Sequence, residues 1–195
     1  RHQSKANLKT SSHNKDYEVS FHKLDLTVDP AISYIQGSVT TYFTPLQSNF
    51  DHIVFDLSDS LQALTATYKG SNLTFSQAND KLTINLNDSL DKGILDSIVV
   101  NYQGSPASSG YGSFTISNHD STPVMWTLSE PYGAKSWWPC KEDLHDKVDS
   151  MVMIVRAPQQ YKVASNGMLI SENVSGNTRT TKWKHNYPVA HYLIA

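Results

Sequence analysis

The sequence predicts an all-β domain made of several sheets, a multi-sheet β-sandwich. Three observations support this fold class. Apolar and polar residues alternate with a period of two along most of the chain. Short groups of Gly, Pro, Asn and Asp separate these runs, as turns separate strands. No stretch before residue 140 has sustained helical periodicity, and 195 residues suffice for one large β-domain with its own core.

The first half of the chain shows the clearest alternation. It begins at Tyr17 and runs to Val28, and its apolar positions shift by one residue near His22–Lys23. One inserted residue is what a β-bulge produces, so we expect a bulge there. Further runs of the same period cover residues 35–43, 53–57, 64–68, 73–75, 82–86 and 98–102. We take residues 1–15 as a flexible leader and 16–195 as a single β-domain.

The second half is less regular. Residues 105–124 are rich in Gly, Ser and Pro, which predicts a long loop. Lys141–Lys147 is compatible with a short helical turn, and a strand resumes at Met151–Val155. Ser165–Gly167 and Ser175–Asn177 read as hairpin turns, because Asn and Gly tolerate positive φ. The last residues, 192–195, are apolar and read as part of a strand, so we expect a longer protein.

Composition excludes several classes of function. The net charge of −2 argues against a nucleic-acid partner. No apolar run approaches the roughly 20 residues of a membrane span. The lone Cys140 excludes an intramolecular disulfide and a thiolate zinc cluster. The eight histidines are scattered without a His-Glu-x-x-His motif, so we expect no metal site and no catalytic residue in this chain.

A cluster of acidic side chains follows the only cysteine. It consists of Glu142, Asp143, Asp146 and Asp149. The spacing is not that of a calcium-binding loop, and lysines interleave with the acids. We therefore expect a solvated, charged turn.

The densest aromatic segment is Trp126–Cys140, which places three tryptophans and two prolines around a single acid, Glu130. We expect at least two of these tryptophans to pack in the core. An acid among bulky aromatic side chains loses part of its hydration, so we expect Glu130 to be partly desolvated.

This segment resembles the N-terminal domain of the aminopeptidase N family of zinc metallopeptidases. That family carries Thr-Gln-x-Glu-Pro, then Ala-Arg, then an aromatic residue before Pro-Cys. The present chain reads Thr127-Leu-Ser-Glu-Pro131, then Ala134-Lys135, then Trp138-Pro-Cys140. Further landmarks agree in order, namely Asn101–Gly104, Ser165–Gly167 and Tyr192–Leu193. The resemblance spans nearly the whole chain beyond the leader.

The resemblance implies a saddle-shaped, non-catalytic domain of a larger zinc-dependent aminopeptidase, which removes N-terminal residues from peptides. In the family, the catalytic domain supplies the zinc site. The expected partners are therefore the N-terminus of a peptide substrate and the protein's own catalytic domain. We expect the present fragment to bind no zinc and to be inactive alone.

The resemblance also assigns roles to one loop. The family's Glu binds the free α-amine of the substrate, which makes Glu130 the amine-binding candidate, with Ser129 and Pro131 completing the substrate-binding loop. The family's Gln, which lines the first side-chain pocket, is Leu128 here, and this change favours an apolar wall. The family's Arg is Lys135. The family often has a cis bond at this Glu-Pro step, and we expect one at Glu130–Pro131.

Two other interpretations stay open. The first is a non-enzymatic extracellular β-sandwich that binds glycans or proteins through aromatic residues, and exposure of Trp126, Trp137 and Trp138 would favour it. The second is a homologue whose catalytic domain has lost its zinc ligands. Composition and the Trp-Trp-Pro-Cys sequence resemble secreted bacterial members, so we expect a secreted or periplasmic location.

Overall fold

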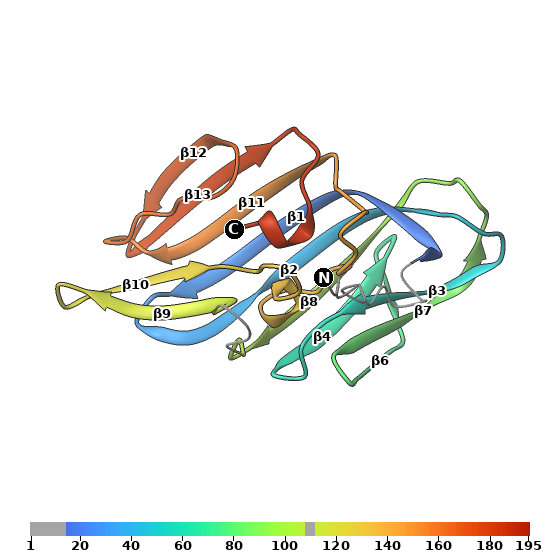
Figure 1. Cartoon of the computed structure of the whole chain (residues 1–195), viewed down its shortest axis with the longest axis horizontal. Helices are drawn as coiled ribbons and strands as arrows, with labels where there is room; N and C mark the ends of the chain where they lie inside the picture. Colours follow the sequence, from blue (N-terminus) through green and yellow to red (C-terminus); the bar gives the residue numbers. More distant parts are fainter. Residues whose placement is uncertain (1–14, 108–111) are drawn as a thin grey trace, which may run out of the picture.

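The computed structural model describes residues 15–107 and 112–195, and they form an all-β structure of three sheets (Figure 1). Nearly all of the expected leader, and residues 108–111 of the Gly-rich segment, lie outside the described residues. The predicted multi-sheet fold class is confirmed. No helix in the described part of the chain has the length and apolar character needed to cross a membrane.

The largest sheet has eight strands and forms the long, twisted body of the molecule (Figure 1). In spatial order these strands are β12 (Met168–Ser175), β13 (Thr178–His185), β11 (Ser150–Pro158), β1 (Tyr17–Asp29), β2 (Ile32–Pro45), β8 (Asp96–Gly104), β4 (Leu61–Tyr68) and β5 (Ser71–Leu73). The sheet is mixed, because β1 and β11 run parallel while its other neighbouring strands are antiparallel.

Two smaller sheets complete the fold. One contains β3 (Phe50–Asp56), β7 (Lys81–Leu90) and β6 (Phe75–Ala78), and the other is a hairpin of β9 (Phe114–His119) and β10 (Thr122–Thr127). The core joins the large sheet to the three-stranded one. Tyr17 of β1 packs its ring against Phe50 and Phe55 and donates a 2.7 Å hydrogen bond to the carbonyl of Val54. Because successive side chains of a strand point to opposite faces, the alternating apolar residues bury one face of each of these two sheets against the other.

Several details differ from the sequence-based expectations. The bulge in β1 lies between Val19 and Phe21, slightly before the expected position. Residues 114–127 form the β9–β10 hairpin, although most of this stretch was expected to be a loop. Its turn uses Asp120 and Ser121 at φ 47° and 67°, a left-handed pair that Asn-Gly usually signals. The hairpin was missed because Asp-Ser is a weak turn signal.

The second half of the chain differs from the predictions in three places and agrees in one. Residues 141–147 form no helix, although Leu144 and His145 make a turn in which the N–H of Asp146 donates to the carbonyl of Asp143 at 3.3 Å. Ser165–Gly167 is not a hairpin turn, because β11 and β12 do not pair with each other. Ser175–Asn177 does connect paired strands, β12 and β13, as predicted. The end of the chain forms a short 3-10 helix, η3 (His191–Leu193), rather than a strand.

Candidate functional site

The candidate site is the turn that follows β10, Leu128–Pro131. The side chain of Leu128 is 43% exposed, whereas Ser129 is only 1% exposed. Glu130 and Pro131 are exposed again, and the peptide bond between them is cis, as predicted. Ser129 therefore attaches the turn to the interior of the domain, and its neighbours form the outer surface of the turn.

Ser129 is held by the aromatic core. The indole N–H of Trp137 donates a 2.9 Å hydrogen bond to the Ser129 hydroxyl. The carbonyl of Trp137 in turn accepts a 2.8 Å hydrogen bond from the Tyr102 hydroxyl of β8. All three side chains are buried, so the turn is connected to the large sheet through hydrogen bonds that water does not reach.

A close backbone approach fixes the other end of the turn. Gly133 donates its N–H to the carbonyl of Ser129 at 2.9 Å, and Leu128 donates to the carbonyl of Ser113 at 3.2 Å. A Cβ atom at Gly133 would lie 2.2 Å from the Ser113 hydroxyl oxygen. The backbone φ of Gly133, −105°, suits any residue. The lack of space beside Ser113 is therefore what requires glycine at this position.

The carboxylate of Glu130 points to solvent and forms no hydrogen bond or ion pair with the described residues. The expected partial desolvation is therefore wrong for this chain, because Trp137 and Trp138 are buried in the core and leave the acid outside. Its acceptor oxygens are available to a cationic group that approaches from outside the domain.

Lys135, which stands at the position of the family's Arg, does not join Glu130. It lies in the 3-10 helix η2 (Ala134–Ser136) and forms a 3.1 Å ion pair with Asp80 in the turn between β6 and β7. Its carbonyl accepts a 2.9 Å hydrogen bond from the N–H of Ser58. The lysine thus attaches the loop to the three-stranded sheet.

The acidic segment after Cys140 is not the solvated turn that we expected. Lys141 and Glu142 are buried, and Lys141 forms an ion pair with Asp146 and donates to the carbonyl of Tyr17 at 2.6 Å. Burial raises the pKa of Glu142 to about 7, against the opposing effect of a hydrogen bond from the N–H of Lys135, and the nearby Asp56 raises it further. Sequence spacing gave no signal of this burial.

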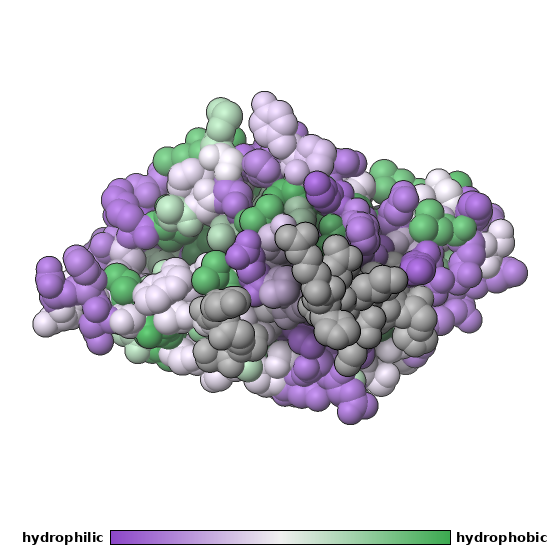
Figure 2. Space-filling model, viewed as in Figure 1, coloured by the Kyte–Doolittle hydropathy of each residue, from purple (hydrophilic) through white to green (hydrophobic). Residues whose placement is uncertain are grey.

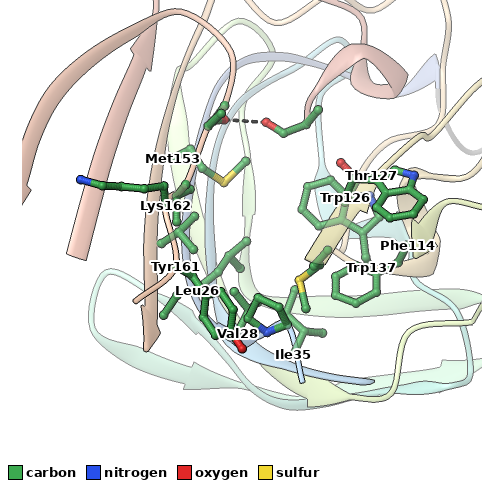
Figure 3. Close-up of a pocket in the computed structure, with 18 residues that line it drawn as sticks. Leu26, Val28, Ile35, Phe114, Trp126, Thr127, Trp137, Met153, Tyr161 and Lys162 are labelled. Atoms are coloured by element: carbon green, nitrogen blue, oxygen red, sulfur yellow. Dashed lines mark hydrogen bonds between the residues drawn. The ribbon is translucent and has the colours of Figure 1, made fainter. Parts of the chain in front are cut away.

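A hollow of about 150 Å³ lies beside the site (Figure 3). Its walls come from β1, β2, β11 and residues 161–165 on one side and from the β9–β10 hairpin and Trp137 on the other. Trp126, at 46% exposed, lines it, whereas Trp137 and Trp138 are buried, which confirms that at least two tryptophans are core residues. The three side chains therefore do not form the exposed platform on which the glycan-binding interpretation depends.

The described residues contain no group of three His, Cys, Asp or Glu side chains that could hold a metal ion. The imidazole of His22 is buried, and burial lowers its pKa to about 3. His191 is buried as well.

Comparison with solved structures identifies the fold as that of zinc metallopeptidases. The chain aligns with the M1 zinc metallopeptidase from Deinococcus radiodurans at a TM-score of 0.82 and 23% identity, covering 91% of this chain and 40% of that one. It aligns with a two-domain M1 zinc metallopeptidase bound to L-arginine at a TM-score of 0.82 and 23% identity, covering 91% of this chain and 41% of that one. It aligns with leukotriene A4 hydrolase from Saccharomyces cerevisiae at a TM-score of 0.75 and 20% identity, covering 92% of this chain and 28% of that one. At sequence identities this low, the comparisons show a shared fold alone.

The three-sheet arrangement thus defines an all-β domain of the kind found in M1 metallopeptidases. The chain belongs to the Peptidase M1 N-terminal domain family, whose profile matches residues 13–193. A search of curated proteins gave no match. The chain spans less than half the length of each of these solved relatives.

Proposed function

We propose that this chain is the N-terminal domain of a zinc-dependent aminopeptidase and that Glu130 binds the α-ammonium group of a peptide substrate. The observation that carries the proposal is the construction of the turn. Ser129 anchors it in the core, while the adjacent Glu130 keeps an exposed carboxylate with no partner among the described residues. A carboxylate held in a fixed place forms a strong charge-assisted hydrogen bond with an ammonium group.

Recognition of the ammonium group explains selection for chain ends. A peptide bond in the middle of a substrate offers no α-ammonium, so a site built around Glu130 leaves its carboxylate unpaired with such a substrate. Leu128 projects from the same turn and is exposed. Its apolar side chain favours an apolar first residue in the substrate.

Zinc belongs to the part of the protein that this chain does not include. A bound zinc ion would supply an activated water molecule for hydrolysis. The described residues offer no three-ligand site, so the role of this chain is to bind and orient the substrate. The isolated chain should have no peptidase activity, and measurable hydrolysis of aminoacyl anilides by the pure chain would contradict this role.

The surface around the site suits contact with a second domain. Figure 2 shows apolar surface over β12 and in the hollow between β11 and the β9–β10 hairpin. Trp126, Leu128 and Leu193 are all large apolar side chains at least 43% exposed. We expect the catalytic domain to cover part of this surface and to close the site around Glu130.

The test is Glu130→Gln in the full-length protein, which removes the charge and keeps the size. We expect the KM for an aminoacyl anilide to rise about 100-fold, because a charge-assisted hydrogen bond contributes about 1.5–3 kcal/mol. Glu18→Gln, at an exposed acid of β1, is the matched control. An unchanged KM in Glu130→Gln would refute the proposal.

A further inference from the structure

Two buried aromatic side chains connect the candidate turn to the centre of the large sheet. Tyr102 of β8 donates its hydroxyl to the carbonyl of Trp137 at 2.8 Å, and the indole N–H of Trp137 donates to the hydroxyl of Ser129 at 2.9 Å. These three residues are at most 2% exposed. Water cannot replace either acceptor, so breaking one of these hydrogen bonds leaves a buried donor without a partner.

Tyr102 is a firm support because it lies at the centre of the sheet. β8 pairs with β2 on one side and with β4 on the other, and Tyr102 stands opposite Gly37 of β2 and Ala63 of β4. Glycine has no side chain and alanine only a methyl group, so these cross-strand neighbours leave room for the large ring. The backbone of Tyr102 is therefore held from both sides, and its hydroxyl projects from a fixed place.

The hydrogen bonds to Ser129 also fix the backbone of Glu130. Ser129 is held through its hydroxyl by Trp137 and through its carbonyl by the N–H of Gly133, at 2.9 Å in both cases. The Ser129 carbonyl shares a planar peptide unit with the nitrogen and the Cα of Glu130. Holding that carbonyl therefore holds the point from which the exposed side chain of Glu130 projects.

A fixed support matters for a carboxylate that binds an ammonium group at the surface of the domain. If the turn were mobile, binding would have to order it, and the cost of ordering would reduce the affinity. A turn that Tyr102 and Trp137 already hold in place needs no such ordering. Loss of the support should therefore weaken substrate binding rather than slow the chemical step.

We propose that Tyr102 and Trp137 are positioning residues that hold the turn Leu128–Pro131 so that Glu130 meets the ammonium group of the substrate. The inference rests on the proposed role of Glu130. It assigns a function in substrate binding to a tyrosine of β8 whose hydroxyl bonds to the protein backbone and touches no substrate.

Tyr102→Phe in the full-length protein tests the proposal, because it removes the hydroxyl and keeps the ring. Tyr17→Phe is the matched control, since Tyr17 is 1% exposed and donates its hydroxyl to the carbonyl of Val54 in β3 at 2.7 Å. Both variants lose the same kind of buried hydrogen bond, so we expect similar losses of stability in urea. Only Tyr102→Phe should raise KM for an aminoacyl anilide, by about fivefold, with kcat unchanged.

Deuterium exchange measures the turn directly. In Tyr102→Phe the backbone amides of residues 128–133 should exchange about five times faster than in the wild type, as loss of one hydrogen bond implies. In Tyr17→Phe the same amides should exchange at the wild-type rate. Equal changes of KM and exchange in the two tyrosine variants would show a general loss of stability and would overturn the inference. Wild-type KM and exchange in Tyr102→Phe would overturn it too.

A double substitution separates this inference from the proposed function. If Tyr102 acts through Glu130, Tyr102→Phe should not raise KM further in a Glu130→Gln background, and a further rise there would contradict the inference. If Glu130→Gln alone leaves KM unchanged, the proposed function fails. Faster exchange in Tyr102→Phe than in Tyr17→Phe would then still show that Tyr102 holds the turn.

Trp137→Phe covers the case in which Tyr102→Phe does not fold. This variant keeps an aromatic ring and removes the indole N–H that the Ser129 hydroxyl accepts. It interrupts the same path at a second point, so we expect a similar rise in KM and faster exchange of residues 128–133. Wild-type KM together with wild-type exchange in Trp137→Phe would overturn the inference.

Discussion

The indole N–H of Trp137 donates a 2.9 Å hydrogen bond to the hydroxyl of Ser129, and both side chains are buried. This contact joins a core tryptophan to the only buried side chain of the turn Leu128–Pro131. The buried part of the aromatic segment therefore supports the candidate site. The proposed binding surface is made by the exposed neighbours of Ser129.

Ser129→Ala should lower the free energy of unfolding by about 1–3 kcal/mol, because the indole N–H of Trp137 would stay buried without its acceptor. Urea denaturation of the 195-residue chain measures the change. Ser117→Ala, at an exposed serine of β9, is the matched control and should have almost no effect.

A double substitution tests more strictly whether the hydrogen bond between Trp137 and Ser129 accounts for the loss of stability. In a Trp137→Phe background no indole N–H is present, so Ser129→Ala should cost clearly less than in the wild-type chain. Equal costs in the two backgrounds would show that the hydrogen bond does not account for the loss.

Gly133→Ala should destabilise the domain by about 1–3 kcal/mol, because added volume in a packed site forces its neighbours to move. The new Cβ would lie 2.2 Å from the hydroxyl oxygen of Ser113 and 3.0 Å from its Cβ. Ser113→Ala removes the nearer of these two atoms, so the double variant should lose less than the sum of the two single losses. Strict additivity, measured by thermal and urea unfolding, would argue against the close approach.

The sequence predicted the fold because its alternation is local and strong. β1 begins at Tyr17, where the alternation begins, and the runs near residues 35–43 and 98–102 lie in β2 and β8. The cis bond at Glu130–Pro131 and the burial of Trp137 and Trp138 were also predicted correctly. These features depend on residue type and on the order of motifs.

Features that depend on distant segments were not predictable. Lys141 and Glu142 are buried because they meet Tyr17 and Asp56 from remote strands. Glu130 is exposed, whereas Trp137 and Trp138, which follow it in the sequence, are buried in the core. The alternation of single residues cannot show which face of a loop the rest of the fold will cover.

The buried Glu142 should make stability depend on pH. Burial, with a contribution from Asp56, raises its pKa from 4.5 to about 7. Between these values the folded state holds a proton that the unfolded state has released, so the free energy of unfolding should fall as pH rises from 4.5 to 7. This contribution is fully present below 4.5 and amounts to at most roughly 3 kcal/mol.

Glu142→Gln should remove that slope, because the amide does not titrate and its oxygen can still accept from the N–H of Lys135. Urea denaturation across this pH range gives the comparison with the wild-type chain. The exposed Glu18→Gln serves as the control, and its curve should parallel that of the wild type. A wild-type slope that persists in Glu142→Gln would assign the pH dependence to another group.

If the proposed function holds, Leu128→Gln should change which peptides the full-length protein prefers. Leu128 is exposed beside Glu130, where the proposed site would receive the first side chain of the substrate. Replacing an apolar wall by an amide should lower kcat/KM for a leucyl anilide relative to a seryl anilide by about tenfold, the size of effect that one pocket contact gives. Leu64→Gln is a close control, because Leu64 is also 43% exposed but lies on β4. If both variants keep the wild-type ratio, Leu128 does not line the pocket.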